Sequence, residues 1–247
     1  MADRHAHDPE AYGRAIAPDY DDLYDDALDT DTAVDCLAGL AGGGPVLELG
    51  IGTGRLALPL VERGLAVHGV DSSPEMVALL RAKPGGADLP VTVGDFADVH
   101  LEERFTLVVL AFNTIFALPT QDAQVGCFAA AAEHLRPGGR FVIEAFVPDP
   151  TRFSHGGMVR PYAIGSDHVI LEVGEIDPAA QRMTTTKVRL GAEGVRLYPA
   201  NHRYAWPAEL DLMARLAGLR MTQRWAGWDR APFTATSDHH LTVYERP

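Results

Sequence analysis

The sequence is short of several features that would assign a protein to a special class. Only two cysteines, Cys36 and Cys127, occur among its 247 residues, and neither has a C-x-x-C partner. Both stand in apolar, helix-like patterns, which predicts buried thiols and no structural metal. No stretch reaches the roughly 18 uninterrupted apolar residues of a membrane helix, and the first ten residues lack the apolar segment of a secretion signal. We therefore expect a cytoplasmic protein that does not bind membranes.

Basic residues are also scarce. The chain has 21 Lys and Arg against 34 Asp and Glu, a formal charge of −13. This charge disfavours a general nucleic-acid binder, and no basic patch is visible. Residues 1–44 contain eleven of the acidic residues and only two arginines, so most of the excess lies at the N-terminus.

What the sequence does contain is an alternation of apolar runs and helical patterns. Nearly continuous apolar runs predict buried strands at 46–49, 66–70, 90–93, 106–111 and 140–146. Helical patterns accompany them at 32–41, 55–63, 74–82 and 122–135. Strands that alternate with helices predict an α/β fold with a doubly wound, mostly parallel sheet.

The pattern changes near residue 156. Four short alternating segments follow, at 158–164, 168–175, 182–190 and 195–204, and turn-forming residues separate them. They predict an antiparallel β-meander. A helix after Trp206-Pro207 and strands near 219–225 and 239–246 come last, so the meander is an insertion before the final elements of the main sheet.

The most informative segment is VLELGIGTGR at 46–55, a strand that ends in a glycine-rich turn. Glycines let the backbone turn tightly and let a ligand approach it closely. Asp71 stands 21 positions after Gly50, at the predicted end of the second strand. A carboxylate there can accept both hydroxyls of a ribose. The two signals together predict a nucleoside cofactor; the alternative is a plain strand-to-helix turn with Asp71 as a helix cap.

The spacing of the glycines indicates which nucleoside. Dinucleotide-binding folds use G-x-G-x-x-G, whereas Gly50, Gly52 and Gly54 form G-x-G-x-G, followed by Arg55. This disfavours a nicotinamide oxidoreductase. Glu48 would repel a pyrophosphate but can bind an ammonium group, and Arg55 can pair with a carboxylate. The implied ligand carries both an amine and a carboxylate.

With these motifs, nearly the whole chain resembles the class I S-adenosylmethionine-dependent methyltransferases, whose first motif reads ELGIGTG here. The resemblance implies a seven-stranded Rossmann-like sheet, S-adenosylmethionine as cofactor and S-adenosylhomocysteine as product. The glycine turn would contact the methionine portion, Asp71 the ribose and Asp95 with Phe96 the adenine. The implied cofactor-binding residues are Glu48, Gly50, Gly52, Gly54, Arg55, Asp71, Ser72, Met76, Asp95, Phe96, Ala111 and Phe112. The segment LRPGGR at 135–140 is another landmark of the family, interpreted as a helix end and a turn.

Two further segments resemble a subgroup. Tyr20 and Tyr24, in YDDLY, resemble the Y-D-x-x-Y of small-molecule methyltransferases, including N,N-dimethyltransferases of deoxyaminosugars, where this segment folds over the cofactor. Plain aromatic packing is the alternative. The meander also resembles this subgroup and the glycine and sarcosine methyltransferases, where it covers the active site or joins subunits. The resemblance implies a small-molecule acceptor, foremost an amine of a natural product or sugar-type metabolite, and allows a homodimer.

The resulting organisation has four parts. We expect an acidic lid and helix at 1–44, a cofactor-binding core at 45–155, an antiparallel insertion at 156–205 as substrate cap or dimer contact, and the last helix and strands at 206–247.

Acceptor-side candidates follow from the strand ends, where ligands of open α/β sheets bind. An amine can lose its proton to solvent, whereas a hydroxyl usually needs a base. We expect His155 to be that base if one exists, with His202 second, and Asn113 to orient the acceptor. Substrate contacts are expected from Thr114, Phe116, Glu144 and Tyr204, although Glu144 could instead face a neighbouring strand.

Three hypotheses about the function stay open at this point. The protein is an amine methyltransferase, an O-methyltransferase that uses His155 or another base, or a cyclase or binding protein of the same fold that transfers no methyl group. His239 and His240 are adjacent in a predicted strand and should face opposite sides, which argues against joint metal binding. An acidic lid could also steer cationic ligands toward the site. The residues proposed for this steering are Asp19, Asp21, Asp22, Asp25 and Asp26.

Overall fold

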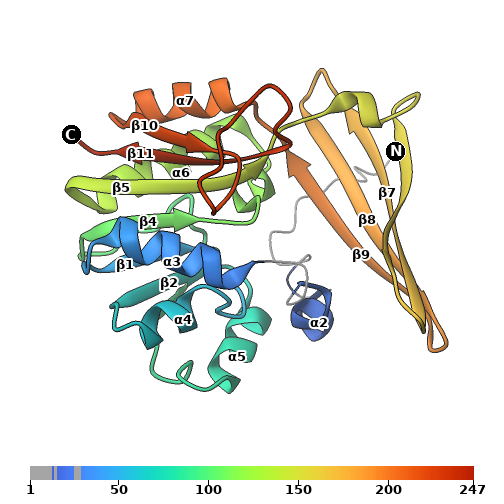
Figure 1. Cartoon of the computed structure of the whole chain (residues 1–247), viewed down its shortest axis with the longest axis horizontal. Helices are drawn as coiled ribbons and strands as arrows, with labels where there is room; N and C mark the ends of the chain where they lie inside the picture. Colours follow the sequence, from blue (N-terminus) through green and yellow to red (C-terminus); the bar gives the residue numbers. More distant parts are fainter. Residues whose placement is uncertain (1–12, 14–15, 25–28) are drawn as a thin grey trace.

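The computed structural model describes Gly13, residues 16–24 and residues 29–247. Figure 1 shows two sheets: a large one with helices packed around it, and a smaller one at one end of the large sheet. The short helix α2 (Tyr20–Tyr24) lies between them. The helix α2 thus lies on the side of the small sheet that faces the large sheet.

The large sheet has seven strands in the order β10-β11-β5-β4-β1-β2-β3. Only β11 is antiparallel to its neighbours, which confirms the expected seven-stranded, mostly parallel, doubly wound sheet. The strands are β1 Val46–Leu49, β2 Val67–Asp71, β3 Val91–Val93, β4 Phe105–Leu110, β5 Leu135–Phe146, β10 Arg220–Trp225 and β11 His239–Glu245. The strand order reverses between β1 and β4, which is where ligands of such sheets bind.

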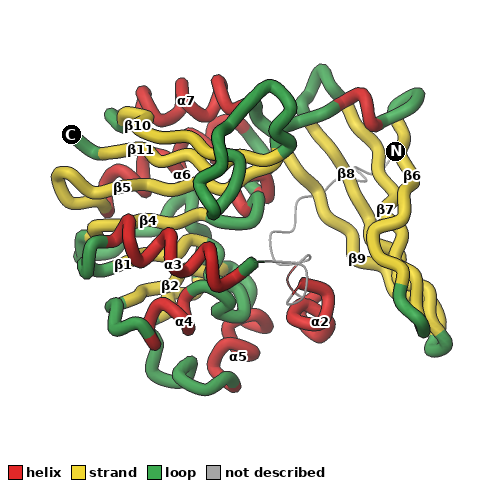
Figure 2. Tube along the Cα trace, viewed as in Figure 1, coloured by secondary structure: helices red, strands yellow, loops and turns green. Residues whose placement is uncertain are grey.

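Helices cover both faces of this sheet, as Figure 2 shows. They are α3 Thr30–Ala41, α4 Ala57–Glu62, α5 Pro74–Ala82, α6 Gln121–His134 and α7 Pro207–Leu216. Side chains cap three of them: Asp29 accepts from the Thr32 N–H, Ser73 from Met76 and Thr120 from Ala123. Short 3₁₀ helices are η1 Ala17–Asp19, η3 Thr114–Ala117 and η4 Pro150–Arg152.

Two apolar layers form the core. One contains Phe105, Phe128 and Phe141 under α6 and α7, and the other packs α3 and α4 on the opposite face. All four residues of β1 are buried, because helices cover both faces of this central strand. Cys36 and Cys127 lie in these layers as buried free thiols, as the sequence predicts. Because both faces of β1 are covered, a ligand can reach this strand only at its carboxyl end.

The smaller sheet is the expected antiparallel meander. Its strands are β6 Gly157–Ile164, β7 His168–Asp177, β8 Arg182–Gly191 and β9 Gly194–Arg203, paired in chain order. Buried Arg203 attaches the end of β9 to the core: its guanidinium donates to Gln124 Oε1 and Glu209 Oε1, each at 2.6 Å. Gln124 lies on α6 and Glu209 on α7, so the meander is anchored to two core helices.

Two local predictions are wrong. The helix expected from Arg55 begins at Ala57, because Gly54, at φ +85°, keeps Arg55 in the turn. The segment 135–139, expected as a helix end and turn, belongs to β5. Leu135 pairs with Phe105, and the Gly138 N–H donates to the Arg246 carbonyl. Strand pairing thus begins directly after α6, with Gly138 at φ +74° providing the bend.

No helix in the described ranges is long and apolar enough to cross a membrane. Within the same residues, no group of three or more His, Cys, Asp and Glu side chains could bind a metal ion. His240 is fully buried whereas His239 is exposed, so the two histidines face opposite sides as predicted.

Candidate active site

The glycine turn connects β1 to α4 at the point where the strand order reverses. Gly50, Gly52 and Gly54 all have positive φ, at 72°, 55° and 85°. A Cβ on Gly50 would stand 2.6 Å from Thr114 Cγ2, so only glycine fits there. The Gly52 N–H donates to Asp71 Oδ2 at 2.7 Å. The turn is therefore held against both β2 and the segment after β4.

A cavity of about 30 Å³ lies at this turn, and we call it the glycine-turn cavity. Glu48, Arg55, Tyr20, Ala111, Phe112 and Thr114 are among its lining residues. Glu48 is 5% exposed, and its Oε2 has no hydrogen-bond partner among the described residues. Burial raises the pKa of Glu48 to about 8; Asp71 raises it further and Arg55 opposes the rise. A buried carboxylate beside a guanidinium suits a ligand with an ammonium and a carboxylate.

Asp71 closes the end of β2. Its Oδ2 accepts from Gly52 and its Oδ1 accepts from the Ser73 N–H at 2.9 Å. Burial raises the pKa of Asp71, and these N–H groups oppose that rise. Each oxygen keeps further acceptor capacity for a hydroxyl. Ser72 follows Asp71 and is half-buried.

The adenine-side candidates differ in exposure. Asp95 is exposed and its Oδ1 accepts from the Ala97 N–H at 2.8 Å. Phe96 is 8% exposed and packs in the apolar layer under α6. Met76 is buried in a different cluster, with Ile16 and Tyr24. In this structure Phe96 and Met76 thus contact protein, while Asp95 faces solvent.

The turn after β4 is strained. Phe112 and Asn113 both have positive φ, at 53° and 65°, which is uncommon for residues other than glycine. Glu144 Oε2 accepts from the Phe112 N–H at 2.8 Å, and its Oε1 accepts from Trp228 Nε1 at 2.7 Å. Asn113 Oδ1 accepts from the Phe146 N–H at 2.7 Å. In the structure, Glu144 and Asn113 therefore fix the backbone that places Phe112 at the cavity.

The segment with Tyr20 and Tyr24 lies over this turn. The two tyrosine rings are 4.9 Å apart, and Tyr24 meets Phe112 edge-on at 4.9 Å. Thr53, in the glycine turn, donates to Asp21 Oδ1 at 2.6 Å. Burial raises the pKa of Tyr20 above its usual range. The tyrosines thus pack on the cavity lining as a cover.

The same segment also contacts the meander, which bears on the proposed steering. Arg196 and the Tyr198 hydroxyl both donate to Asp19, each at 2.8 Å. Asp21 pairs with Lys83 at 2.6 Å. The charges of Asp19 and Asp21 are therefore balanced locally, because each carboxylate is ion-paired. Asp22 is exposed, and Asp25 and Asp26 lie outside the described residues.

One face of the meander, the inner face, packs toward α2. Ile170 and Tyr198 share a buried cluster with Tyr24 there. Lys187, on β8 beside Tyr198, has its Nζ 4.2 Å from the Tyr24 ring centroid and 4.1 Å from that of Tyr162. Lys187 and Tyr162 are not among the residues predicted from the sequence. Alternating positions along a strand show which residues share a face of the sheet. They do not show which of the two faces contacts α2.

The remaining candidates lie elsewhere. His155 is exposed in the loop before β6, and its Nδ1 is 3.1 Å from Ser154 Oγ. Phe116 is fully buried with its ring 4.7 Å from Phe146. Tyr204 is 2% exposed beside Trp206. In the structure, Phe116 and Tyr204 thus pack in the protein interior.

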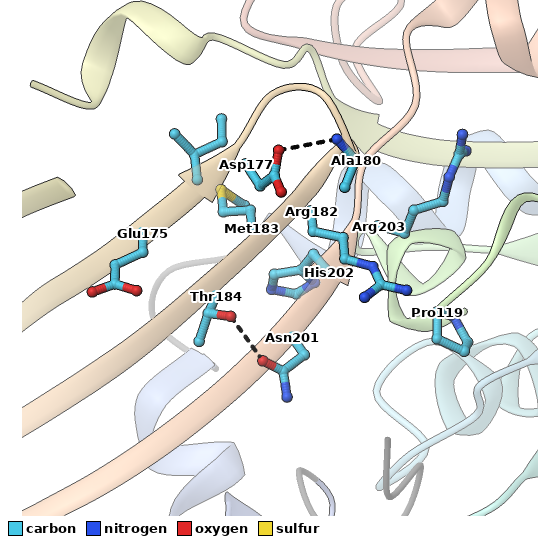
Figure 3. Close-up of a pocket in the computed structure, with 11 residues that line it drawn as sticks. Pro119, Glu175, Asp177, Ala180, Arg182, Met183, Thr184, Asn201, His202 and Arg203 are labelled. Atoms are coloured by element: carbon cyan, nitrogen blue, oxygen red, sulfur yellow. Dashed lines mark hydrogen bonds between the residues drawn. The ribbon is translucent and has the colours of Figure 1, made fainter. Parts of the chain in front are cut away.

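His202 lines a second cavity, of about 290 Å³, where the meander meets the loop before α6 (Figure 3). We call it the meander cavity; Pro119, Glu175, Arg182, Asn201 and Arg203 also line it. His202 Nδ1 is buried and, within the part of the chain that is described, has no partner. Burial lowers the pKa of His202 to about 4, Lys187 lowers it further and Glu172 opposes this. His202 is thus a neutral imidazole near pH 7.

Known proteins match this arrangement. A methyltransferase-domain family model matches residues 46–139. The cypemycin N-terminal methyltransferase of a Streptomyces species is 32% identical over 207 residues, which cover 83% of this chain and 84% of that protein. The chain belongs to the S-adenosylmethionine-dependent methyltransferases. Within this family, the structure of the CcbJ methyltransferase from Streptomyces caelestis is 42% identical, with a TM-score of 0.91, and covers 97% of this chain and 99% of that chain.

A more distant methyltransferase shares the fold. CalS10, an amino pentose methyltransferase from Micromonospora echinaspora, is 23% identical with a TM-score of 0.67 and covers 91% of this chain and 92% of that chain. The chain described in Figure 1, as a member of this family, uses S-adenosylmethionine as its cofactor. The side chains at the glycine-turn cavity suit this cofactor chemically. Glu48 Oε2, which has no partner among the described residues, and the Arg55 guanidinium are complementary to the ammonium and the carboxylate of its methionine portion.

Proposed function

We propose that this methyltransferase transfers a methyl group to an amine nitrogen of a small-molecule acceptor of the natural-product or sugar type. The observation that carries the proposal is the similarity to the cypemycin N-terminal methyltransferase, which extends over 84% of the length of that relative. Tyr20 and Phe112, which line the glycine-turn cavity, support it, because aromatic rings can contact an alkylammonium group.

The chain's own residues have few chemical tasks in such a transfer. The bound cofactor supplies a methyl group that its sulfonium already activates. Glu48, Arg55 and Asp71 would hold the cofactor by its ammonium, carboxylate and ribose. Phe112 and the two tyrosines would align the acceptor and exclude water, which is where most of the rate enhancement arises for an activated electrophile.

The histidines disfavour a hydroxyl acceptor. A hydroxyl needs a strong base within hydrogen-bond reach. His155 is exposed and contacts Ser154, and the pKa of His202, lowered to about 4 by burial, makes it a weak base. An amine with its own basic nitrogen needs less help, so these positions favour nitrogen over oxygen.

The test is a matched panel of acceptors. Dipeptide amides with a free N-terminus and methyl glycosides of amino sugars are compared with analogues in which a hydroxyl replaces the amine. Release of S-adenosylhomocysteine and the mass of the product are measured. We expect turnover of the amines only. Turnover of the hydroxyl analogues at equal rates would refute the proposal, and cofactor binding without turnover across the panel would favour a binding protein.

A further inference from the structure

The strained turn after β4 is held by one residue of the neighbouring strand. Glu144, on β5, binds the N–H groups of both residues that have positive φ. Its carboxylate accepts from Phe112 at 2.8 Å, and its backbone carbonyl accepts from Asn113 at 3.0 Å. Phe112 lines the glycine-turn cavity. The position of this cavity wall therefore depends on how the Glu144 carboxylate is oriented.

A second donor fixes that orientation. Trp228 Nε1 donates to Glu144 Oε1 at 2.7 Å, whereas Oε2 accepts from the Phe112 N–H. Hydrogen bonds to a carboxylate are stronger than those between neutral groups, and one bond on each oxygen prevents the carboxylate from rotating. Trp228 lies 84 positions after Glu144 in the chain. A residue distant in sequence thus contributes to the shape of the cavity.

The connection between β10 and β11 presents Trp228 in a compact turn. At the base of this turn, the Ala226 N–H donates to the Ala231 carbonyl at 2.8 Å. Arg230, at φ +60°, has its guanidinium 5.0 Å from the centroid of the Trp225 ring. These contacts hold the turn without using the side chain of Trp228. The indole therefore reaches the carboxylate from a backbone that is already fixed.

Packing alone does not require tryptophan at this position. Trp228 and Phe112 are both partly buried against the apolar layer that contains α3 and α4. A phenylalanine at position 228 would keep most of that contact. Among the apolar aromatic side chains, however, only tryptophan has an N–H group to donate. The distinctive feature of Trp228 is therefore its hydrogen bond to Glu144.

We propose that Trp228 is a positioning residue of the methyl-transfer site, which acts through Glu144 to fix the Phe112 wall of the glycine-turn cavity. Without the indole, the carboxylate would rotate more freely and the strained backbone would lose its fixed acceptor. The shape that binds the cofactor would then be populated less, which lowers the apparent affinity. The inference goes beyond the amine specificity proposed above, and turnover of hydroxyl acceptors would leave it intact.

Glutamine at position 144 provides a sharp test. A carboxylate offers two acceptor oxygens, whereas an amide offers one acceptor and a donating NH2 group. In Glu144→Gln, the Phe112 N–H and the Trp228 indole would compete for one oxygen, and the losing donor would face the NH2 group. When Trp228→Phe is added, that oxygen is free to accept from Phe112. Removing the indole should therefore partly repair the defect that Glu144→Gln causes.

The first measurement is the affinity for S-adenosylhomocysteine, determined by calorimetry. We expect Trp228→Phe to weaken binding about fivefold and Glu144→Gln about thirtyfold, because Glu144→Gln leaves a donor unpaired. The double variant should bind at least about threefold more tightly than Glu144→Gln alone. Such a recovery cannot arise from loss of fold. Losses that multiply in the double variant would show that the two residues act independently, and would overturn the proposal.

Trp225→Phe is the matched control for the binding measurement. Trp225 flanks the same turn and packs against the same apolar layer, but the hydrogen bond to Glu144 comes from Trp228. We expect Trp225→Phe to keep the affinity of the wild type within about twofold. If it weakened binding as much as Trp228→Phe does, packing of the turn would explain both losses and the proposal would fail.

The second measurement needs neither the cofactor nor activity. The protein has three tryptophans, so ¹⁵N-labelled protein should give three indole N–H signals, and Trp228→Phe identifies the signal of Trp228. We expect Glu144→Gln to shift this signal, because the carboxylate acceptor is lost. We also expect Trp228→Phe to shift the backbone amide signal of Phe112, since the two donors share one carboxylate. A Phe112 amide that does not respond to Trp228→Phe would refute the role assigned to the indole.

Discussion

The two sides of the active site are built in different ways. The cofactor side consists of one continuous turn with its neighbours, in which Gly50 and Gly52 take backbone conformations that few other residues adopt. The proposed acceptor side would be assembled from α2, the end of β4 and the inner face of the meander, which are distant in sequence and in contact in the structure. The first side depends on backbone shape and the second on side chains that tertiary packing brings together. Substitutions should therefore affect the two sides differently.

The largest effect is expected at Gly50. Gly50→Val places a Cβ 2.6 Å from Thr114 Cγ2 at a φ of +72° that a branched residue cannot adopt without strain. We expect at least a hundredfold weaker binding of S-adenosylhomocysteine, measured by calorimetry. Gly43→Val is the control, since Gly43 also has positive φ but a Cβ there would meet no atom within 4 Å. If both variants lost the same affinity for S-adenosylhomocysteine, backbone strain alone would explain the weaker binding, and the close contact of Gly50 with Thr114 would not.

Glu48→Gln should weaken the cofactor complex by about tenfold and change its pH dependence. Burial raises the pKa of Glu48 to about 8, so the free protein holds a proton there at pH 7. Binding an ammonium favours the carboxylate and releases about one proton. Calorimetry of S-adenosylhomocysteine binding in buffers of different ionisation enthalpy measures that proton. Affinity should rise between pH 6 and 8 in the wild type and stay flat in the variant.

The same residue also affects folding. A raised carboxyl pKa favours the folded state below the ordinary value of 4.5, and this contribution is lost as the pH rises to about 8. Without ligand, Glu48→Gln should therefore gain stability relative to wild type as pH increases. Urea unfolding at pH 5 and pH 8 tests this sign, and a difference between the two proteins that does not change with pH would contradict it.

On the acceptor side, Asp19→Asn should have a moderate effect. It removes the ion pair with Arg196 and weakens the contact with the Tyr198 hydroxyl, so the segment 16–24 loses one of its links to the meander. We expect a several-fold higher KM for the acceptor with little change in cofactor affinity. Asp22→Asn is the matched control, because Asp22 is exposed. If Asp22→Asn raised KM equally and added salt removed the difference, steering by charge would explain the lid instead.

The smallest effect concerns His202. Its pKa, lowered by burial to about 4, means that neutral His202 contributes stability above its ordinary value of 6.5. This contribution is lost as the pH falls from 6.5 toward 4. His202→Gln should flatten the stability curve in that window, whereas exposed His155→Gln should leave it unchanged. Burial lowers the pKa of His240 to about 3, so in both variants part of the decrease in stability with falling pH remains.

These differences also explain what could be predicted from the sequence. The spacing of Gly50, Gly52 and Gly54 and the position of Asp71 reflect local backbone geometry, so they indicated the cofactor and the fold. The side chains of Phe116 and Glu144 could not be oriented in this way. Phe116 turns into the core, and Glu144 supports the backbone of Phe112.

Lys187 shows the limit most clearly. Its strand was predicted, but the face that meets α2 depends on how the meander attaches to the core through Arg203. No pattern within residues 182–190 contains that information. The acidic N-terminal segment is the converse case: its charge was visible in the composition, whereas the pairing of Asp19 with Arg196 across 177 positions was not.

The attachment of the meander at Arg203 has a mechanical consequence. The strands β7 to β9 have ten residues each, which makes the sheet about 33 Å long. Arg203 fixes one end of β9 to the core, and Asp19 ties Arg196, toward the other end, to the N-terminal segment. A sheet of that length pivoting by about five degrees at Arg203 would carry its free tip through about 3 Å. The ion pair between Asp19 and Arg196 therefore restrains the sheet far from its anchor at Arg203, where a small rotation produces the largest displacement.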